Sequence, residues 1–129
     1  MSIIERFEDI EAWKLARKAT RRVYEVSSSG EFGRDFALVN QIRRACISVM
    51  SNIAEGFERD GNKEFLQFLS VAKGSCGEVR SQLYIALDQN YLDQRTFDEL
   101  VLVLIETSRV ISGFMKYLRN SSERGSKFK

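Results

Sequence analysis

The chain of 129 residues contains no proline, no histidine and only two cysteines. Without proline, no helix carries a built-in break, so long uninterrupted helices are possible. Without histidine, the chain lacks the commonest general base and metal ligand, which disfavours an enzyme. We therefore expect a helical protein with no catalytic residues, no metal site and no cofactor.

Long apolar runs are also missing. No run approaches the ~18 residues of a membrane-spanning helix, so we expect no membrane contact. The first six residues, MSIIER, lack the basic-then-apolar order of a signal peptide, which favours a cytoplasmic protein. Cys46 and Cys76 fall at expected core positions, and helix spacing places them too far apart for a disulfide. We predict two free, buried thiols.

Four segments carry apolar residues at spacings of three and four, which is typical of helices. They predict helices at about 9–26, 35–57, 62–89 and 93–119, within a single domain that covers residues 1–129. The polar tail, 120–129, is expected to be disordered. Four helices with short connections predict an all-α fold, the antiparallel up-down-up-down four-helix bundle.

Each segment has an apolar face that we predict to form the core, and we expect Asn62 to cap the third helix. In the first segment the inward residues are Trp13, Ala16, Thr20, Val23 and Tyr24. In the second they are Val39, Ile42, Cys46, Val49, Ile53 and Phe57. In the third they are Phe65, Leu69, Ala72, Cys76, Val79, Leu83 and Ala86. In the fourth they are Phe97, Val101, Leu104, Ser108, Ile111, Met115 and Leu118.

Three further stripes exceed what one bundle requires. The fourth helix has a second apolar stripe, which packs either within the monomer or against another subunit: Leu100, Val103, Thr107, Val110, Phe114 and Tyr117. The third has a ridge of small residues, which either lets another helix approach closely or consists of glycines tolerated at the surface: Ser70, Gly74, Gly77 and Ser81. The second has a polar stripe, which is either a solvated face or a network between subunits: Gln41, Arg44, Ser48, Asn52, Glu55 and Arg59.

Basic residues gather on the first helix and at the adjacent end of the second, although the net charge is only +2. The candidate nucleic-acid-binding residues are Lys14, Arg17, Lys18, Arg21, Arg22, Arg43 and Arg44. Such a patch can neutralise phosphates, or it can be an ordinary solvated face. No aromatic platform for stacking bases is evident among these residues.

Several segments carry a family resemblance that spans about residues 7–118. They are 7–13 (FEDIEAW), 41–45 (QIRRA), 48–56 (SVMSNIAEG), 64–69 (EFLQFL) and 72–75 (AKGS), followed by Glu78. These segments resemble the bacterial four-helix bundle proteins encoded within 23S rRNA intervening sequences. The run 41–78 is the most specific part.

This resemblance implies a closed four-helix bundle and a ring-like homopentamer. That family in turn resembles the accessory variability protein of diversity-generating retroelements, a basic pentamer that binds nucleic acid and a reverse transcriptase. The family motif and the stripes together suggest subunit-interface residues. They are Gln41, Arg44, Ser48, Asn52, Glu55, Gly56, Arg59, Ser70, Gly74, Gly77 and Ser81.

The sequence thus favours a non-enzymatic, homo-oligomeric helical scaffold that binds RNA or DNA electrostatically. The alternative is a protein–protein interaction scaffold with no nucleic-acid role, in which the basic flank serves solvation or docks a protein partner.

Overall fold

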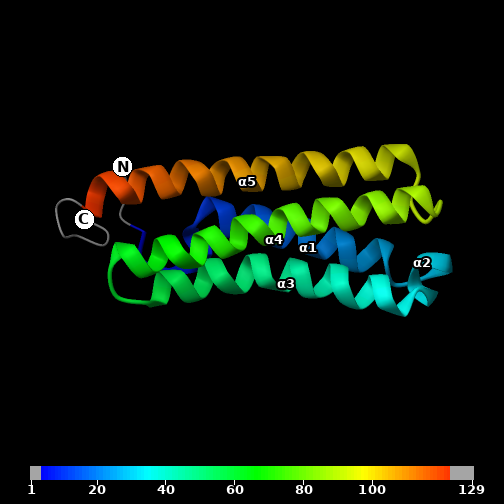
Figure 1. Cartoon of the computed structure of the whole chain (residues 1–129), viewed down its shortest axis with the longest axis horizontal. Coiled ribbons are helices and arrows are strands. Elements are labelled where there is room, and N and C mark those ends of the chain that lie inside the picture. Colours follow the sequence, from blue (N-terminus) through cyan, green and yellow to red (C-terminus); the bar gives the residue numbers. More distant parts are fainter. Residues whose placement is uncertain (1–3, 123–129) are drawn as a thin grey trace.

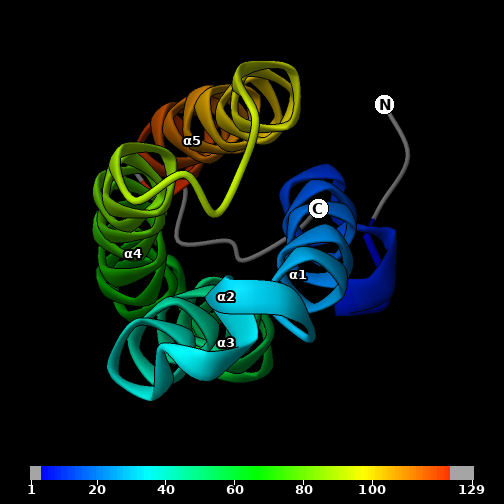
Figure 2. The same ribbon diagram turned by 90° about the vertical axis from the view of Figure 1, so that its right-hand side faces the viewer.

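The computed structural model describes residues 4–122, and the regular structure in that range is helical. Its elements are a 3-10 helix, η1 (Phe7–Asp9), and the helices α1 (Glu11–Val26), α2 (Gly30–Arg34), α3 (Phe36–Glu58), α4 (Asn62–Asp88) and α5 (Gln94–Ser122). The four long helices, α1, α3, α4 and α5, run side by side (Figure 1). Seen end-on they follow one another around the bundle, and α5 also contacts α1 (Figure 2). The predicted all-α four-helix bundle is confirmed.

The segments between and beyond the predicted helices hold the main differences. Residues 7–9 form η1, so α1 begins at Glu11 rather than near residue 9. The expected loop after α1 contains α2, whose Phe32 is buried and stacks on Tyr91 with ring centroids 5.4 Å apart. A five-residue helix is too short to show a periodic pattern. Helix α5 continues to Ser122, so 120–122 are helical instead of disordered, and 123–129 lie outside the described residues.

The predicted core positions of α3 and α4 are all buried, those of α4 completely. On α5 the prediction also holds, except that Val101 and Ser108 are half-buried.

The face predicted for α1 is wrong in part. Its buried residues are Ala12, Ala16, Ala19 and Val23, whereas Thr20 is half-buried, as is Trp13, and Tyr24 is 37 % exposed. Alanines allow α1 to approach its neighbours closely, and the bulky aromatic side chains are displaced to the edges of that contact.

The second apolar stripe of α5 packs within the chain. Leu100 and Thr107 are buried, and the half-buried Val110, Phe114 and Tyr117 pack on a core cluster that includes residues of α1. A bundle helix that touches two neighbours needs an apolar surface toward each of them. The stripe is therefore explained without a second subunit.

Side-chain hydrogen bonds hold the ends of the helices. Asp35 caps α3 by accepting the backbone N–H of Leu38 at 3.1 Å, and it accepts the Tyr91 hydroxyl at 2.9 Å. Asn62 does not cap α4 as predicted. It is the first residue of α4, and its Nδ2 donates to the carbonyl oxygen of Leu118 at 3.2 Å. The cap position belongs to Gly61, whose φ of +88° favours glycine.

Arg43 fixes the C-terminal end of α1 against α3. Its Nε donates to the Ser27 hydroxyl at 3.0 Å, and its guanidinium lies 4.4 Å above the ring centre of Tyr24. These contacts set where α1 lies, and with it the basic residues that α1 carries. Within residues 4–122, no helix is sufficiently long and apolar to cross a membrane.

Candidate nucleic-acid interface

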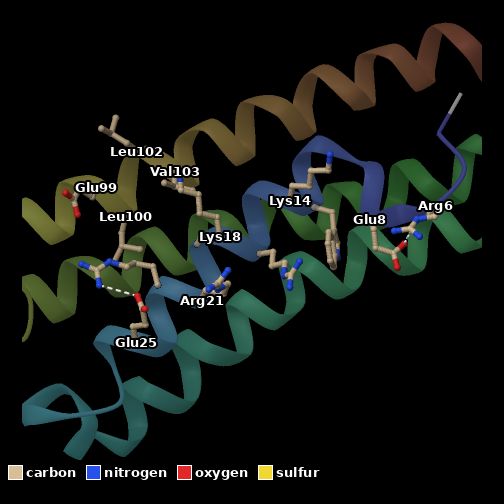
Figure 3. Close-up of a pocket in the computed structure, with 14 residues that line it drawn as sticks. Arg6, Glu8, Lys14, Lys18, Arg21, Glu25, Glu99, Leu100, Leu102 and Val103 are labelled. Atoms are coloured by element: carbon tan, nitrogen blue, oxygen red, sulfur yellow. Dashed lines mark hydrogen bonds and ion pairs between the residues drawn. The ribbon is translucent and has the colours of Figure 1, made fainter. Parts of the chain in front are cut away.

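A groove of about 1000 Å³ runs between α1 and α5 (Figure 3). Three acidic side chains line it: Glu8, Glu25 and Glu99. Twice as many basic side chains line it: Arg6, Lys14, Arg17, Lys18, Arg21 and Arg22. The groove is therefore positively charged, although the whole chain is close to neutral.

Each of the three carboxylates already has an arginine partner. Glu8 lies 3.8 Å from Arg6, and Glu25 lies 3.4 Å from Arg22. Glu99 lies 3.5 Å from Arg95, outside the groove. Exposed pairs of this kind contribute little to stability, but they do cancel charge locally.

Four basic side chains of the groove remain uncompensated. Lys14, Arg17, Lys18 and Arg21 are exposed, and they form no ion pair within the described part of the chain. From the first to the last of them α1 rises only about 10 Å. The result is a dense row of cations along one edge of the groove.

The seven candidate nucleic-acid-binding residues thus fall into two sets. Lys14, Arg17, Lys18, Arg21 and Arg22 gather in the groove. Arg43 instead binds the end of α1, and Arg44 is exposed on α3 and is not among the residues that line the groove.

Sequence reasoning missed the apolar part of the groove. Trp13, a predicted core residue, is half-buried against the core and also lines the groove. Leu100, Leu102 and Val103 line it from α5. The spacing of four between Trp13, Arg17 and Arg21 was a usable signal, because such residues share a helix flank. No comparable pattern in the sequence indicates the residues that α5 contributes, because their position beside α1 depends on how the two helices pack.

Part of the polar stripe of α3 is used within the chain. The Ser48 and Ser75 hydroxyl oxygens lie 2.8 Å apart, and Asn52 Nδ2 donates to the Ser48 carbonyl oxygen at 2.8 Å. Arg59 pairs with Glu55 at 2.8 Å. Gln41 and Arg44 remain exposed. The stripe therefore joins α3 to α4 at Ser48 and leaves only some of its members for a partner.

The glycines of the predicted interface occupy different surroundings. Gly56 is buried, and a Cβ there would lie 2.7 Å from atoms of both Phe65 and Phe68, so it allows α3 and α4 to pack closely. The small-residue ridge of α4, in contrast, is exposed at all four positions. A Cβ added at Gly74 or Gly77 would meet nothing within 4 Å, which leaves the space above the ridge open.

The two thiols have the burial that the sequence predicts. Cys46 and Cys76 are free and buried. Burial raises the pKa of the Cys46 thiol to about 12 and that of Cys76 to about 11, so both stay protonated at neutral pH and are poor nucleophiles. Among the described residues, no group of three or more acidic or cysteine side chains could hold a metal ion.

Comparisons with solved structures and protein families show what this chain is similar to. A solved structure from Bacteroides thetaiotaomicron, described as a protein with unknown function from the S23 ribosomal protein family, is similar with a TM-score of 0.74 and 17 % identity. The similarity covers 81 % of this chain and 98 % of that one. No curated protein matches the chain. The model of the 23S rRNA-intervening sequence proteins matches residues 8–113, and the chain belongs to this family.

Proposed function

We propose that this protein is a non-enzymatic, homo-oligomeric helical scaffold that binds RNA or DNA through the groove between α1 and α5. The observation that carries the proposal is the row of four exposed, unpaired cations on α1. Each cation can contact a backbone phosphate and release condensed counterions, which drives sequence-independent binding. The resemblance of the family to the nucleic-acid-binding accessory protein of retroelements agrees with this activity.

Neutralising the row is expected to abolish binding at low salt. The variant carries Lys14→Gln, Arg17→Gln, Lys18→Gln and Arg21→Gln. With labelled RNA and DNA, the logarithm of the binding constant of the unchanged protein should fall linearly with the logarithm of salt concentration. Removing four phosphate contacts should lower that slope by roughly 3 and weaken binding by about 100-fold or more at low salt.

A matched variant controls for net charge. It carries glutamine at four exposed basic positions of α4 and α5 outside the groove: Lys63, Lys73, Arg109 and Lys116. It has the same net charge as the groove variant, and we expect it to bind nearly as well as the unchanged protein. Equal losses in the two variants would attribute binding to overall charge and contradict a site in the groove.

We propose that copies of this chain assemble through the small-residue ridge of α4. Gly74 and Gly77 are exposed beneath open space, and Val71 and Ile85, spaced to lie beside the ridge, are 52 % and 47 % exposed. A glycine inside a helix is unfavourable relative to alanine by about 1 kcal/mol, which close contact with another backbone would offset.

Leucine at Gly74 and Gly77 is therefore expected to break the assembly. Light scattering should show the mass of one chain for the double variant and a multiple of it for the unchanged protein, five-fold for the pentamer that the family implies. Gly113→Leu is the control, because Gly113 is equally open but lies on α5. An unchanged mass in the double variant would exclude the ridge as the interface.

A second candidate function is a protein-interaction scaffold without a nucleic-acid role. Large apolar side chains outside the groove favour it, since Phe36 is 73 % exposed and Tyr84 is 54 % exposed. Purification that returns one protein in fixed ratio, with no nucleic acid at low salt, would support this function over the first.

A further inference from the structure

We propose that the groove holds a single-stranded segment of RNA or DNA, with one base stacked against Trp13. This inference rests on the proposed nucleic-acid binding and adds the form of the nucleic acid that is bound. Proteins that take single strands combine a cationic track for the backbone with aromatic side chains for the bases. The groove between α1 and α5 contains both.

Trp13 is placed to serve as the stacking surface. It is half-buried in the wall of the groove, next to the cation row. Phe7 packs edge-on against it, with ring centroids 5.2 Å apart, which holds the indole in position. The Arg17 guanidinium lies over the indole, 5.8 Å from the ring centre, so a cation already contacts the ring. Arg17 is exposed, and a base could take its place while the guanidinium turns to a phosphate.

The α5 side of the groove is partly apolar, with the carboxylate of Glu99 beside the apolar side chains. In Figure 3, Lys14 lies toward the end with Arg6 and Glu8, while Leu100, Leu102 and Val103 lie toward the other, with Lys18 between them. Leu102 is 67 % exposed, which leaves an apolar side chain open to a ligand. The groove therefore offers the exposed apolar side chain of Leu102 in addition to Trp13 and the cation row.

A duplex would use only part of this surface. Its bases stay inside the stack, and its outer surface offers mainly phosphate and sugar, which require the cations but not Trp13 or the exposed Leu102. A single strand can turn its bases out toward apolar side chains while its phosphates follow the cations. The combination of a cation row with Trp13 and an exposed leucine thus favours a single strand over a duplex.

Trp13 is the chain's one tryptophan, so its fluorescence reports directly on the groove. We would titrate the full chain at low salt with short oligo(dT), oligo(rU) and a blunt duplex of the same length. Both single strands should quench the emission and bind at least about 10-fold more tightly than the duplex, in line with the energy of stacking one base. The two single-stranded arms also determine whether RNA or DNA is preferred.

Variants of Trp13 test the stacking contact by anisotropy of labelled oligonucleotides. Trp13→Ala should weaken single-strand binding by about 5- to 150-fold, and Trp13→Phe should retain most of it. Tyr84→Ala, an exposed aromatic on α4 outside the groove, should have no effect. If Trp13→Ala fails to fold, the quenching and the phenylalanine variant still decide the question.

Two outcomes separate this inference from the function on which it rests. Equal affinity for duplex and single strand, with unchanged tryptophan emission, would overturn the single-strand inference and leave electrostatic binding intact. Absence of binding to every nucleic acid at low salt would overturn both.

Discussion

Phe65→Ala is expected to lower the free energy of unfolding by about 3–5 kcal/mol, because it removes a large side chain from a packed core. Phe65 is completely buried. Its ring centroid lies 6.2 Å from that of Phe57 and 5.3 Å from that of Phe114, so α3 and α5 both pack against it. Urea denaturation followed by circular dichroism measures the change.

The same substitution at an exposed phenylalanine provides the control. Phe36 is 73 % exposed at the start of α3, and Phe36→Ala should change stability by less than about 0.5 kcal/mol. A similar small effect at both positions would contradict the packing around Phe65.

Gly56→Ala should destabilise the protein by about 1–3 kcal/mol, even though alanine is the better helix former. The added methyl group would lie 2.7 Å from Cδ1 of Phe65 and from Cβ of Phe68. The Phe68 atom is next to the α4 backbone, so it cannot rotate away, and the two helices must move apart. This cost exceeds the gain in helix propensity, which is at most about 1 kcal/mol.

Gly113→Ala should have the opposite sign. Gly113 lies inside α5, and a Cβ there would meet nothing within 4 Å. Only the helix propensity then changes, and it should stabilise the chain by about 0.5–1 kcal/mol. Thermal unfolding of both variants tests the contrast. A stabilised Gly56→Ala protein would show that α3 and α4 tolerate a wider separation.

The Gly56→Ala substitution should leave the groove intact. Gly56 lies on α3, whereas the groove is lined by α1 and α5 together with Arg6 and Glu8. Below its unfolding temperature, the Gly56→Ala protein should therefore bind nucleic acid like the unchanged protein. Loss of binding in a folded Gly56→Ala variant would instead connect the groove to the α3–α4 contact.

The sequence by itself determined the helices and most of the core. The apolar spacing in α4, from Phe65 to Ala86, is regular enough that every predicted core position is buried. Successive core residues in α4 are three or four positions apart, so one local pattern specifies both the helix and its inward face. The row from Lys14 to Arg21 was equally visible, because residues on one helix need no tertiary information to be neighbours.

Only the tertiary structure decided which neighbours each stripe meets. The second stripe of α5 faces α1, and Arg43 binds the end of α1 instead of joining the cations. Trp13 packs half-buried against the core and also lines the groove. These outcomes depend on the rotation of each helix about its axis and on the distance between helices. Both are set by the sizes of side chains far apart in the sequence, such as Gly56 against Phe65 and Phe68. The apolar periodicity of one helix gives no information about how its side chains fit against those of another helix.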